Sequence, residues 1–132
     1  MHKYIEIKFI SKKKGRGAFA RINIRKGTVI DVAPIILLKN SDYEQIQDTI
    51  IYEYCYEWAD PKHMPEFENA IILSVSQFIN HSFSPNARYL YDYDENAIEF
   101  SAIKDIRKGE EITMNYNGLV DDKTPVWFEV VD

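Results

Sequence analysis

Cysteine is nearly absent from this chain of 132 residues, because Cys55 is the only one. A single thiol excludes an intramolecular disulfide and a cysteine-rich zinc cluster. The histidines, His2, His63 and His81, are scattered without the spacing of metal ligands, whereas structural zinc requires a full set of nitrogen or sulfur ligands. The sequence therefore predicts no metal site and favours a reducing compartment.

Long apolar runs are also missing. The first residues, Met1 to Glu6, already carry charge and never reach the apolar run of a signal peptide. No stretch approaches the ~20 apolar residues that a membrane span needs. We expect an intracellular, soluble protein with no membrane partner.

Positive charge is in the minority, since 16 Lys and Arg face 21 Asp and Glu and the formal net charge is -5. General nucleic-acid binding relies on a basic surface that displaces counterions from phosphates. The basic run from Lys12 to Arg16 lies between two strand-like segments and is typical of a solvated turn. The charge balance disfavours nucleic acid and favours a cationic partner.

What the sequence does contain is typical of one globular domain, with 45% hydrophobic and 28% charged residues, so we expect a single domain over residues 1–132. Alternating apolar and polar residues predict a mainly β (α+β) fold. Strands are expected at 4–10, 29–32, 35–38, 87–93, 97–102 and 111–115, with an apolar segment at 70–74. Pro34 separates two of them because it cannot donate to a central ladder. Gly15-Arg16-Gly17 predicts a turn, and Asp94-Glu95-Asn96 a hairpin.

Aromatic residues make up 14% of the chain, and several alternate over residues 50–58. The period of two predicts a strand with a wholly aromatic face, formed by Tyr52, Tyr54, Tyr56 and Trp58. Such a face either packs on the core or provides walls for an alkyl or ammonium-bearing ligand. Both interpretations remain open at this stage.

A helix is predicted where Ser41 precedes Glu44 by three residues, which is the pattern of a capping box, and we expect it to run to about Asp48. An internal similarity links Ile24-Arg25-Lys26-Gly27 with Ile106-Arg107-Lys108-Gly109. Two short copies are too few for a solenoid, so they predict equivalent turns within one domain.

Familiar catalytic patterns are missing. The chain has neither a glycine-rich Gly-Lys-Ser/Thr loop nor a serine in a nucleophile elbow. Cys55, in the middle of the expected aromatic strand, is interpreted as a small buried hydrophobic residue rather than a nucleophile. Two segments stay unexplained, the polar cluster at 77–86 and the strand-like segment at 110–118 that ends in a tyrosine and a turn.

These segments carry a resemblance to a known family. The chain contains Gly15-Arg16-Gly17, then Asn80-His81-Ser82-Phe83-Ser84-Pro85-Asn86, then Glu111-Ile112-Thr113-Met114-Asn115-Tyr116. In this order the motifs resemble those of SET-domain protein lysine methyltransferases. The Gly-x-Gly piece alone is weak, but the middle motif followed by the third is highly specific. The resemblance spans almost the whole chain and is similar to the small single-domain type of bacteria and large viruses.

The resemblance implies several short curved sheets, with the C-terminal segment threading under a loop in a knot-like arrangement. It also implies S-adenosylmethionine as cofactor, with a peptide substrate on the opposite face and a narrow channel between them. The implied cofactor-binding residues are Gly15, Arg16, Gly17, Asn80, His81 and Tyr116. Tyr116 is placed at the methyl-transfer point as the catalytic residue.

The chain departs from the family pattern in two places. Many larger members have cysteine where this chain has Phe83 and use it, with later cysteines, to hold zinc in a segment that closes the site. Here Trp127 and Phe128 are expected to stack on adenine in place of that segment, or simply to pack on the core. The family's Tyr-x-Gly motif is missing before Asn80, so Tyr54, Tyr56 and Trp58 are candidates for the substrate channel.

The function implied is methylation of lysine in a histone or another basic tail. A catalytically inactive SET-like peptide-binding module is the first alternative, and a β-barrel nucleic-acid binder using exposed aromatics is the second. The expected partner is a lysine-containing peptide, with no direct nucleic acid, and a homodimer is a further expectation. The expected location is cytoplasmic or nucleoid-associated, or the host nucleus for a viral or secreted protein.

Overall fold

The computed structural model describes residues 1–60, 62 and 65–126. Within these residues the strands are β1 (Ile5–Ser11), β2 (Gly15–Ala20), β3 (Val29–Leu38), β4 (Tyr56–Glu57), β5 (Asn69–Ile72), β6 (Asn80–His81), β7 (Ala87–Asp92), β8 (Ala97–Ala102) and β9 (Thr113–Met114). The helices are α1 (Asn40–Gln45) and the 3-10 helices η1 (Ile50–Tyr54) and η2 (Val75–Phe78). The prediction of a mainly β fold with few short helices is confirmed.

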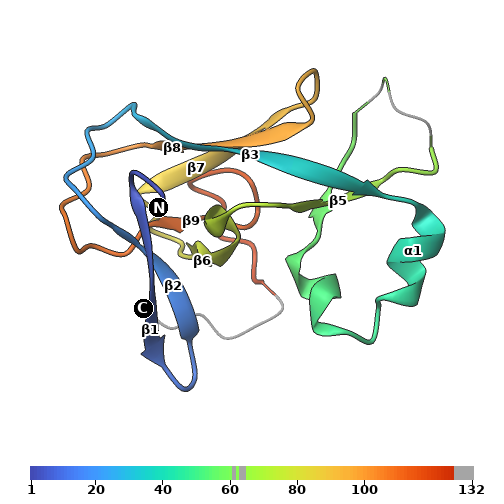
Figure 1. Ribbon diagram of the computed structural model, residues 1–132, viewed down its shortest axis with the longest axis horizontal. Helices are drawn as coiled ribbons and strands as arrows, with labels where there is room; N and C mark the ends of the chain where they lie inside the picture. Colours follow the sequence, from blue (N-terminus) through green and yellow to red (C-terminus); the bar gives the residue numbers. More distant parts are fainter. Residues whose placement is uncertain (61, 63–64, 127–132) are drawn as a thin grey trace.

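The described strands form three small sheets. β1 and β2 make an antiparallel pair, β6 and β9 make a parallel pair, and a five-stranded sheet has the order β4-β5-β3-β8-β7. Figure 1 shows β3 crossing the molecule, with the β1–β2 hairpin near one end and the lobe that contains α1 and β5 near the other. Several short, curved sheets thus replace one extended sheet, as expected.

β3 is one continuous strand, which corrects the prediction of two strands separated by Pro34. Its first part, up to Pro34, pairs with β8, and its second part, from Ile35, pairs with β5. Pro34 lies where the partner changes, and its carbonyl accepts a hydrogen bond from the Leu73 N–H at 2.9 Å. A residue without an N–H is tolerated there because one ladder ends as the other begins.

Residues 50–58 do not form the predicted aromatic strand. Residues 50–54 form η1, with backbone bonds such as Tyr52 N–H to the Thr49 carbonyl at 3.2 Å, and only Tyr56–Glu57 is extended. Tyr52 instead stacks on Tyr43 of α1, with 4.9 Å between the ring centroids. The alternating aromatics therefore point to different surroundings and do not share one face.

Two smaller predictions in this lobe also change. The helix α1 begins at Asn40 and its N-cap residue, Lys39, makes no side-chain capping bond, so the capping box at Ser41 is wrong although the helix exists. Cys55 follows η1 and is half-buried, which corrects the expectation of a buried strand residue. Its partial burial raises the pKa of the thiol.

The two similar sequence segments meet in space. Ile24 and Ile106 exchange backbone hydrogen bonds of 2.7 and 2.8 Å. Each segment then turns at a glycine with positive φ, 88° at Gly27 and 89° at Gly109. The prediction of equivalent turns is confirmed, and their pairing ties the start of β3 to the segment that leads into β9.

The predicted hairpin over 87–102 is confirmed as β7 and β8, with Tyr89 opposite Phe100. Phe100, Ile98 and Trp58 are fully buried in the core, together with Ile79 from the segment after η2. Burying side chains of this size stabilises the fold by about 1.5–3 kcal/mol each. This core supports the short β6–β9 pair, where the two unexplained sequence segments meet.

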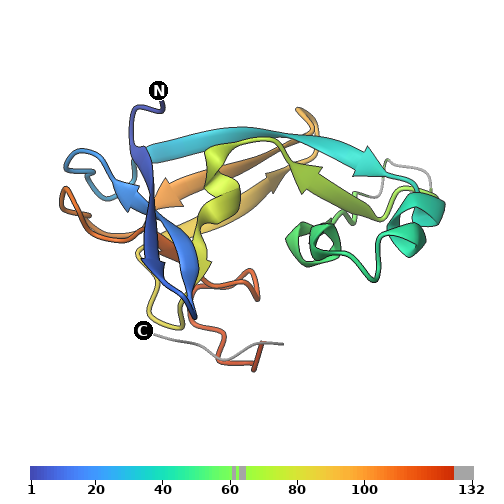
Figure 2. The same cartoon turned by 60° about the horizontal axis from the view of Figure 1, so that its bottom comes forward.

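β6 and β9 pair in parallel, with Asn80 opposite Thr113 and His81 opposite Met114. The Ser82 N–H continues the pairing to the Met114 carbonyl at 2.9 Å. In Figure 2 the red segment that follows β9, up to residue 126, lies below the sheets. The two motifs are thus adjacent, while the knot-like threading stays a prediction. Among the described residues, no helix is long and apolar enough to span a membrane.

Candidate functional site

The two glycines of Gly15-Arg16-Gly17 are required for different reasons. Residues 12–14 make the turn between β1 and β2, and the predicted turn at 15–17 is instead the start of β2. Gly15 has a φ of 75°, a conformation that favours glycine. A Cβ on Gly17 would lie 2.7 Å from Ile10 Cδ1, 2.8 Å from Glu111 Oε2 and 2.9 Å from Asn80 Nδ2, so the ends of these side chains would have to shift.

Asn80 links this strand to the rest of the site. Its Nδ2 donates to the Arg16 carbonyl at 3.1 Å and to Glu111 Oε2 at 2.9 Å. The guanidinium of Arg16 lies over the ring of Phe78, 4.4 Å from its centroid, and so points along the surface near η2. The backbone of Arg16, rather than its side chain, therefore contacts the middle motif.

Glu111 is held from two sides. Its second oxygen, Oε1, forms an ion pair of 2.8 Å with Lys14 Nζ, and both side chains are mostly shielded, 16% exposed for Lys14 and 19% for Glu111. An ion pair with so little solvent around it is screened less than a surface pair. The carboxylate thus joins the first, middle and last motifs in one network.

Asn86 fixes the backbone of the last motif. Its Nδ2 donates to the Glu111 carbonyl at 2.8 Å, and its Oδ1 accepts from the Thr113 N–H at 2.9 Å. A single amide therefore satisfies one acceptor and one donor of the strand opposite it. This contact holds residues 111–113 beside the middle motif.

His81 sets the position of Tyr116. The ring of His81 is 3% exposed, and its Nδ1 accepts a hydrogen bond from the Tyr116 N–H at 3.0 Å. The ring also meets that of Tyr116 at 5.3 Å and that of Phe83 at 4.4 Å, both in edge arrangements. An accepting Nδ1 requires that atom to be unprotonated, so the ring presents its proton at Nε2 when neutral.

The hydroxyl of Tyr116 has a fixed direction, because it donates to the Ile79 carbonyl at 2.8 Å. The Tyr116 carbonyl in turn accepts from the Tyr89 hydroxyl at 3.1 Å. Burial raises the pKa of Tyr116 well above its ordinary value, and the nearby Tyr54, Glu111 and Tyr89 add to the shift. Tyr116 therefore remains a neutral phenol whose oxygen lone pairs point away from Ile79.

Tyr54 and Tyr56 lie near Tyr116, and their assignment to a substrate channel stays a prediction. Tyr54 contributes to the raised pKa of Tyr116, and burial, followed by the charges of Tyr116, Tyr89 and Tyr91, raises the pKa of Tyr56. The ring of Tyr56 meets that of Tyr89 edge-on at 5.5 Å. Several phenol oxygens thus gather around Tyr116, although no strand connects residues 54 and 56.

Trp58 lies elsewhere. It is 1% exposed and packs edge-on against Tyr91 at 5.5 Å and Tyr93 at 4.9 Å. The structure thus places Trp58 in the core beside these rings, and its role as a channel wall stays a prediction. Trp127 and Phe128, which were expected to stack on adenine, lie outside the described residues.

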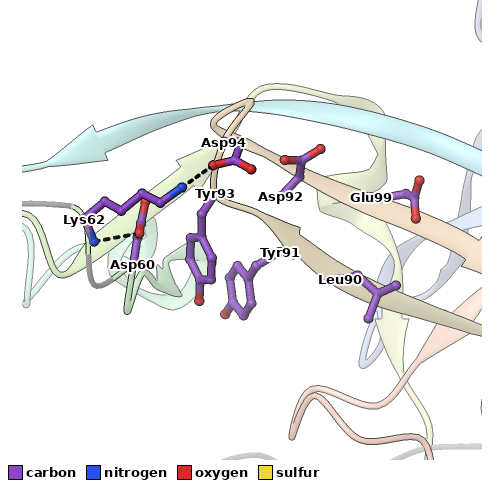
Figure 3. Close-up of a pocket in the computed structure, with 8 residues that line it drawn as sticks. All are labelled: Asp60, Lys62, Leu90, Tyr91, Asp92, Tyr93, Asp94 and Glu99. Carbon is purple, nitrogen blue, oxygen red and sulfur yellow. Dashed lines mark hydrogen bonds and ion pairs between the residues drawn. The ribbon is translucent and has the colours of Figure 1, made fainter.

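An acidic hollow of about 430 Å³ opens at the edge strand β7 (Figure 3). The carboxylates of Asp92, Asp94 and Glu99 line it, with the stacked rings of Tyr91 and Tyr93 below them. Lys62 pairs with Asp94 at 2.6 Å and holds the pKa of that carboxyl below its ordinary value. The carboxylates of the hollow thus add negative charge to the surface at Tyr91 and Tyr93, the two rings that pack on Trp58.

Comparison with known proteins assigns the chain to a family. Residues 15–117 match the family model described as "SET domain", which is most of the chain. The chain belongs to the SET domain family. The matched residues include all three motifs, so the resemblance based on them is confirmed.

Relatives of this SET domain include named histone methyltransferases. A Schizosaccharomyces pombe protein, "Histone-lysine N-methyltransferase, H3 lysine-37 specific", is 29% identical over 120 residues, covering 90% of this chain and 74% of its own length. The Neurospora crassa protein "Histone-lysine N-methyltransferase, H3 lysine-9 specific dim-5" is 28% identical over 134 residues, covering 84% of this chain and 40% of its own. Both relatives are thus named as histone-lysine N-methyltransferases.

Solved structures agree on the fold. A Plasmodium falciparum protein named as a histone methyltransferase superposes with a TM-score of 0.68 at 26% identity, covering 88% of this chain and 95% of that one. A Chaetomium thermophilum Polycomb Repressive Complex 2, bound to S-adenosylmethionine, superposes with a TM-score of 0.68 at 22% identity, covering 88% of this chain and 15% of that one. The second match shows the fold alone.

The SET domain brings together most of the residues selected from sequence. The Arg16 carbonyl and Gly17 lie against Asn80, and His81 bonds the backbone of Tyr116, while Gly15 begins the same strand as Arg16 and Gly17. The binding roles assigned to these residues stay predictions. Three further contributors were missed as site residues: Asn86, Glu111 and Lys14. Asn86 and Glu111 stand inside the quoted motifs, and that position was the available signal. For Lys14 the sequence offered no signal except its place directly before Gly15.

Phe83 occupies the position at which the resemblance implies a cysteine in larger members of the family. Phe83 packs on His81, and Lys123 donates from Nζ to the Phe83 carbonyl at 2.6 Å. The described residues contain no cluster of three or more His, Cys, Asp or Glu side chains placed to hold a metal ion. The contact with Lys123 draws the segment after Tyr116 toward the middle motif.

Proposed function

We propose that this chain transfers methyl groups from S-adenosylmethionine to lysine side chains of a protein, with histone-like basic tails as the substrate class. The observation that carries the proposal is the fixed position of Tyr116, whose hydroxyl donates to the Ile79 carbonyl and whose backbone N–H donates to His81, with Tyr54 and Tyr56 nearby. The family and its named relatives support the reaction type.

The residues present fit the proposed cofactor. Both N–H groups of the Asn80 amide are used within the protein, which leaves Oδ1 as an acceptor with no partner among the described residues. The open surroundings of Gly15 allow a ligand close to the backbone. In the proposed site, Asn80, the Gly15–Gly17 backbone and the His81 segment would hold the cofactor, which when bound supplies a methyl group on a sulfonium.

The chain's own contribution to this reaction is alignment rather than acid–base chemistry. The substrate lysine must be neutral, since the ammonium has no lone pair, and buried aromatic surroundings lower its pKa. Tyr116 stays protonated and directs its oxygen dipole away from Ile79, where it can orient the amine and oppose the positive charge of the transition state. No strong base is needed at Tyr116.

The charge of the chain supports a basic substrate. The net charge is -5, and the hollow at β7 is lined by several carboxylates. A negative surface raises the local concentration of a cationic peptide and speeds its association, less so at high salt. These features favour a lysine-rich tail over nucleic acid.

The test combines calorimetric titration with mass spectrometry. We expect S-adenosylmethionine to bind the purified chain, and a lysine-rich histone-tail peptide to gain mass in steps of one methyl group, while the same peptide with arginine at every lysine does not. Cofactor and peptide binding without methyl transfer would instead support the inactive module. No cofactor binding, together with salt-dependent retention on single-stranded DNA, would support the nucleic-acid binder.

A further inference from the structure

Glu111 of the last motif contacts the middle motif and the β1–β2 hairpin through the two oxygens of its carboxylate. One carboxylate oxygen accepts from Asn80 Nδ2 at 2.9 Å, and the other pairs with Lys14 Nζ at 2.8 Å. We propose that Glu111 is a positioning residue for the cofactor's amino-acid end, because together with the Arg16 carbonyl it fixes which atom of the Asn80 amide faces the ligand. The proposal rests on the proposed function and names a residue that acts within it through Asn80.

The chemistry of the contacts fixes the orientation of the Asn80 amide. The partners on one side, the Arg16 carbonyl and the Glu111 carboxylate, can only accept hydrogen bonds. Only the NH2 group of Asn80 can face them, so a flipped amide would place oxygen against oxygen. Oδ1 is therefore directed away from both, as an acceptor that suits a donating ligand group.

The most favourable donor for this oxygen is an ammonium. A hydrogen bond from a charged donor is stronger than one from a neutral amino group. The cofactor proposed here carries an ammonium at its amino-acid end and a neutral amino group on adenine. The amide orientation set by Glu111 and the Arg16 carbonyl therefore favours the ammonium over adenine at Asn80.

Lys14 keeps the carboxylate in place. Because the pair is mostly shielded, the lysine balances the charge of Glu111 and occupies the oxygen that Asn80 does not use. Glu111 Oε2 lies only 2.8 Å from the position that a Cβ on residue 17 would take, so the glycine there leaves room for the carboxylate. Lys14 and Asn80 thus each bind one oxygen of the Glu111 carboxylate.

The experiment measures ligand affinity by calorimetry, with two probes, and needs no turnover. S-adenosylhomocysteine carries the amino-acid end, whereas methylthioadenosine carries adenine without it. In Glu111→Ala we expect the affinity for S-adenosylhomocysteine to fall by ~10-fold or more, as for loss of a hydrogen bond to a charged group, with methylthioadenosine changed less than about 2-fold. Equal losses for both probes would overturn the assignment to the ammonium.

Three further variants distinguish a loss of affinity caused by a misplaced Asn80 amide from one caused by general damage to the structure. Glu111→Gln keeps an acceptor oxygen for Asn80 and should retain affinity within about 3-fold. Glu110→Ala removes the same charge from the exposed neighbouring side chain and should match the wild type. In Glu111→Ala combined with Asn80→Ala, the second substitution should add little, because both act on one contact. Full additivity, or a glutamine variant as weak as the alanine variant, contradicts the proposal.

Folding of each variant is checked by circular dichroism and thermal melting. If Glu111→Ala does not fold, Glu111→Met, which keeps the length of the side chain without the oxygens, takes its place with the same expected results. A wild-type chain that does not bind S-adenosylhomocysteine contradicts the proposed function and this inference together. Binding by the wild type that is unchanged in the variant contradicts this inference alone.

Discussion

The buried ring of His81 accepts the backbone N–H of Tyr116 through Nδ1 at 3.0 Å, although 35 residues separate the two along the chain. This bond lies at the end of the β6–β9 pair and fixes where the chain leaves the last strand. The tyrosine ring therefore stands against Ile79 and among the other tyrosines because of a histidine in another motif. The middle motif thus positions the predicted catalytic residue as well as the predicted cofactor site.

Tyr116→Phe should reduce turnover far more than cofactor affinity. The ring and its packing remain, but the oriented hydroxyl is lost, and loss of one preorganised dipole typically costs ~10²–10³ in rate. The Ile79 carbonyl also loses its donor, so a stability loss of about 1 kcal/mol is expected. Methylation of a lysine-rich peptide is followed by mass spectrometry and binding by calorimetry. Turnover close to wild type would remove Tyr116 from the catalytic role.

Tyr54→Phe and Tyr56→Phe should change how many methyl groups are added rather than whether transfer occurs. Their hydroxyls lie near Tyr116, where they limit the space and the hydrogen bonds available to a partly methylated amine. The ratio of mono-, di- and trimethylated peptide is read by mass spectrometry at matched turnover. Tyr93→Phe is the control, because Tyr93 stacks on Tyr91 at the hollow. An unchanged ratio in both variants removes these residues from the proposed channel.

Asn86→Ala should destabilise the fold by about 2–4 kcal/mol. The substitution leaves the Glu111 carbonyl and the Thr113 N–H without their partner in a partly buried place. The free energy of unfolding is measured by denaturant titration. Asn23→Ala is the control, because its exposed side chain accepts a single bond from the Lys108 N–H, and a small effect is expected. Equal effects would show that the Asn86 contact does not stabilise the last motif.

Gly17→Ala should disrupt the site more than Gly15→Ala. A Cβ at position 17 would press on Glu111 and Asn80, and Ile10 blocks its other side. At position 15 a Cβ meets nothing within 4 Å, and only the strain of the positive φ remains, about 1–2 kcal/mol. We expect S-adenosylhomocysteine binding to be lost in Gly17→Ala and largely kept in a folded Gly15→Ala. The reverse order would contradict the contacts described for Gly17.

Stability should fall in alkaline solution. Burial is the main cause that raises the pKa of Tyr56, Tyr89, Tyr91 and Tyr116 above the ordinary value of 10.0. Above that pH the unfolded chain loses tyrosine protons first, so the stability present below pH 10.0 declines as the pH rises toward the folded pKa values. Denaturant titrations at increasing pH check this, with tyrosinate absorbance as a second signal. Free ionisation of these tyrosines in a fully folded chain would contradict it.

Local patterns in the sequence were sufficient for much of the fold. The hairpin over 87–102 and the strand expected at 4–10, which the structure shows at Ile5–Ser11, follow from alternation and turn residues, which act between near neighbours. The same local evidence failed over 50–58, where alternating aromatics fit a strand but Tyr52 packs on Tyr43 and the backbone forms a 3-10 helix. Periodicity cannot decide such a short segment, because packing partners elsewhere select its conformation.

The sequence by itself determined the motifs, their order and the family they indicate. Only the tertiary structure decided that Asn86 holds the backbone of the last motif, that His81 sets the position of Tyr116, and that Glu111 orients Asn80. Each of these bonds joins residues from different motifs. A hydrogen bond needs its atoms within about 3 Å and in line. No spacing along the chain specifies that geometry before the β6–β9 pair and the β1–β2 hairpin have brought the three motifs together.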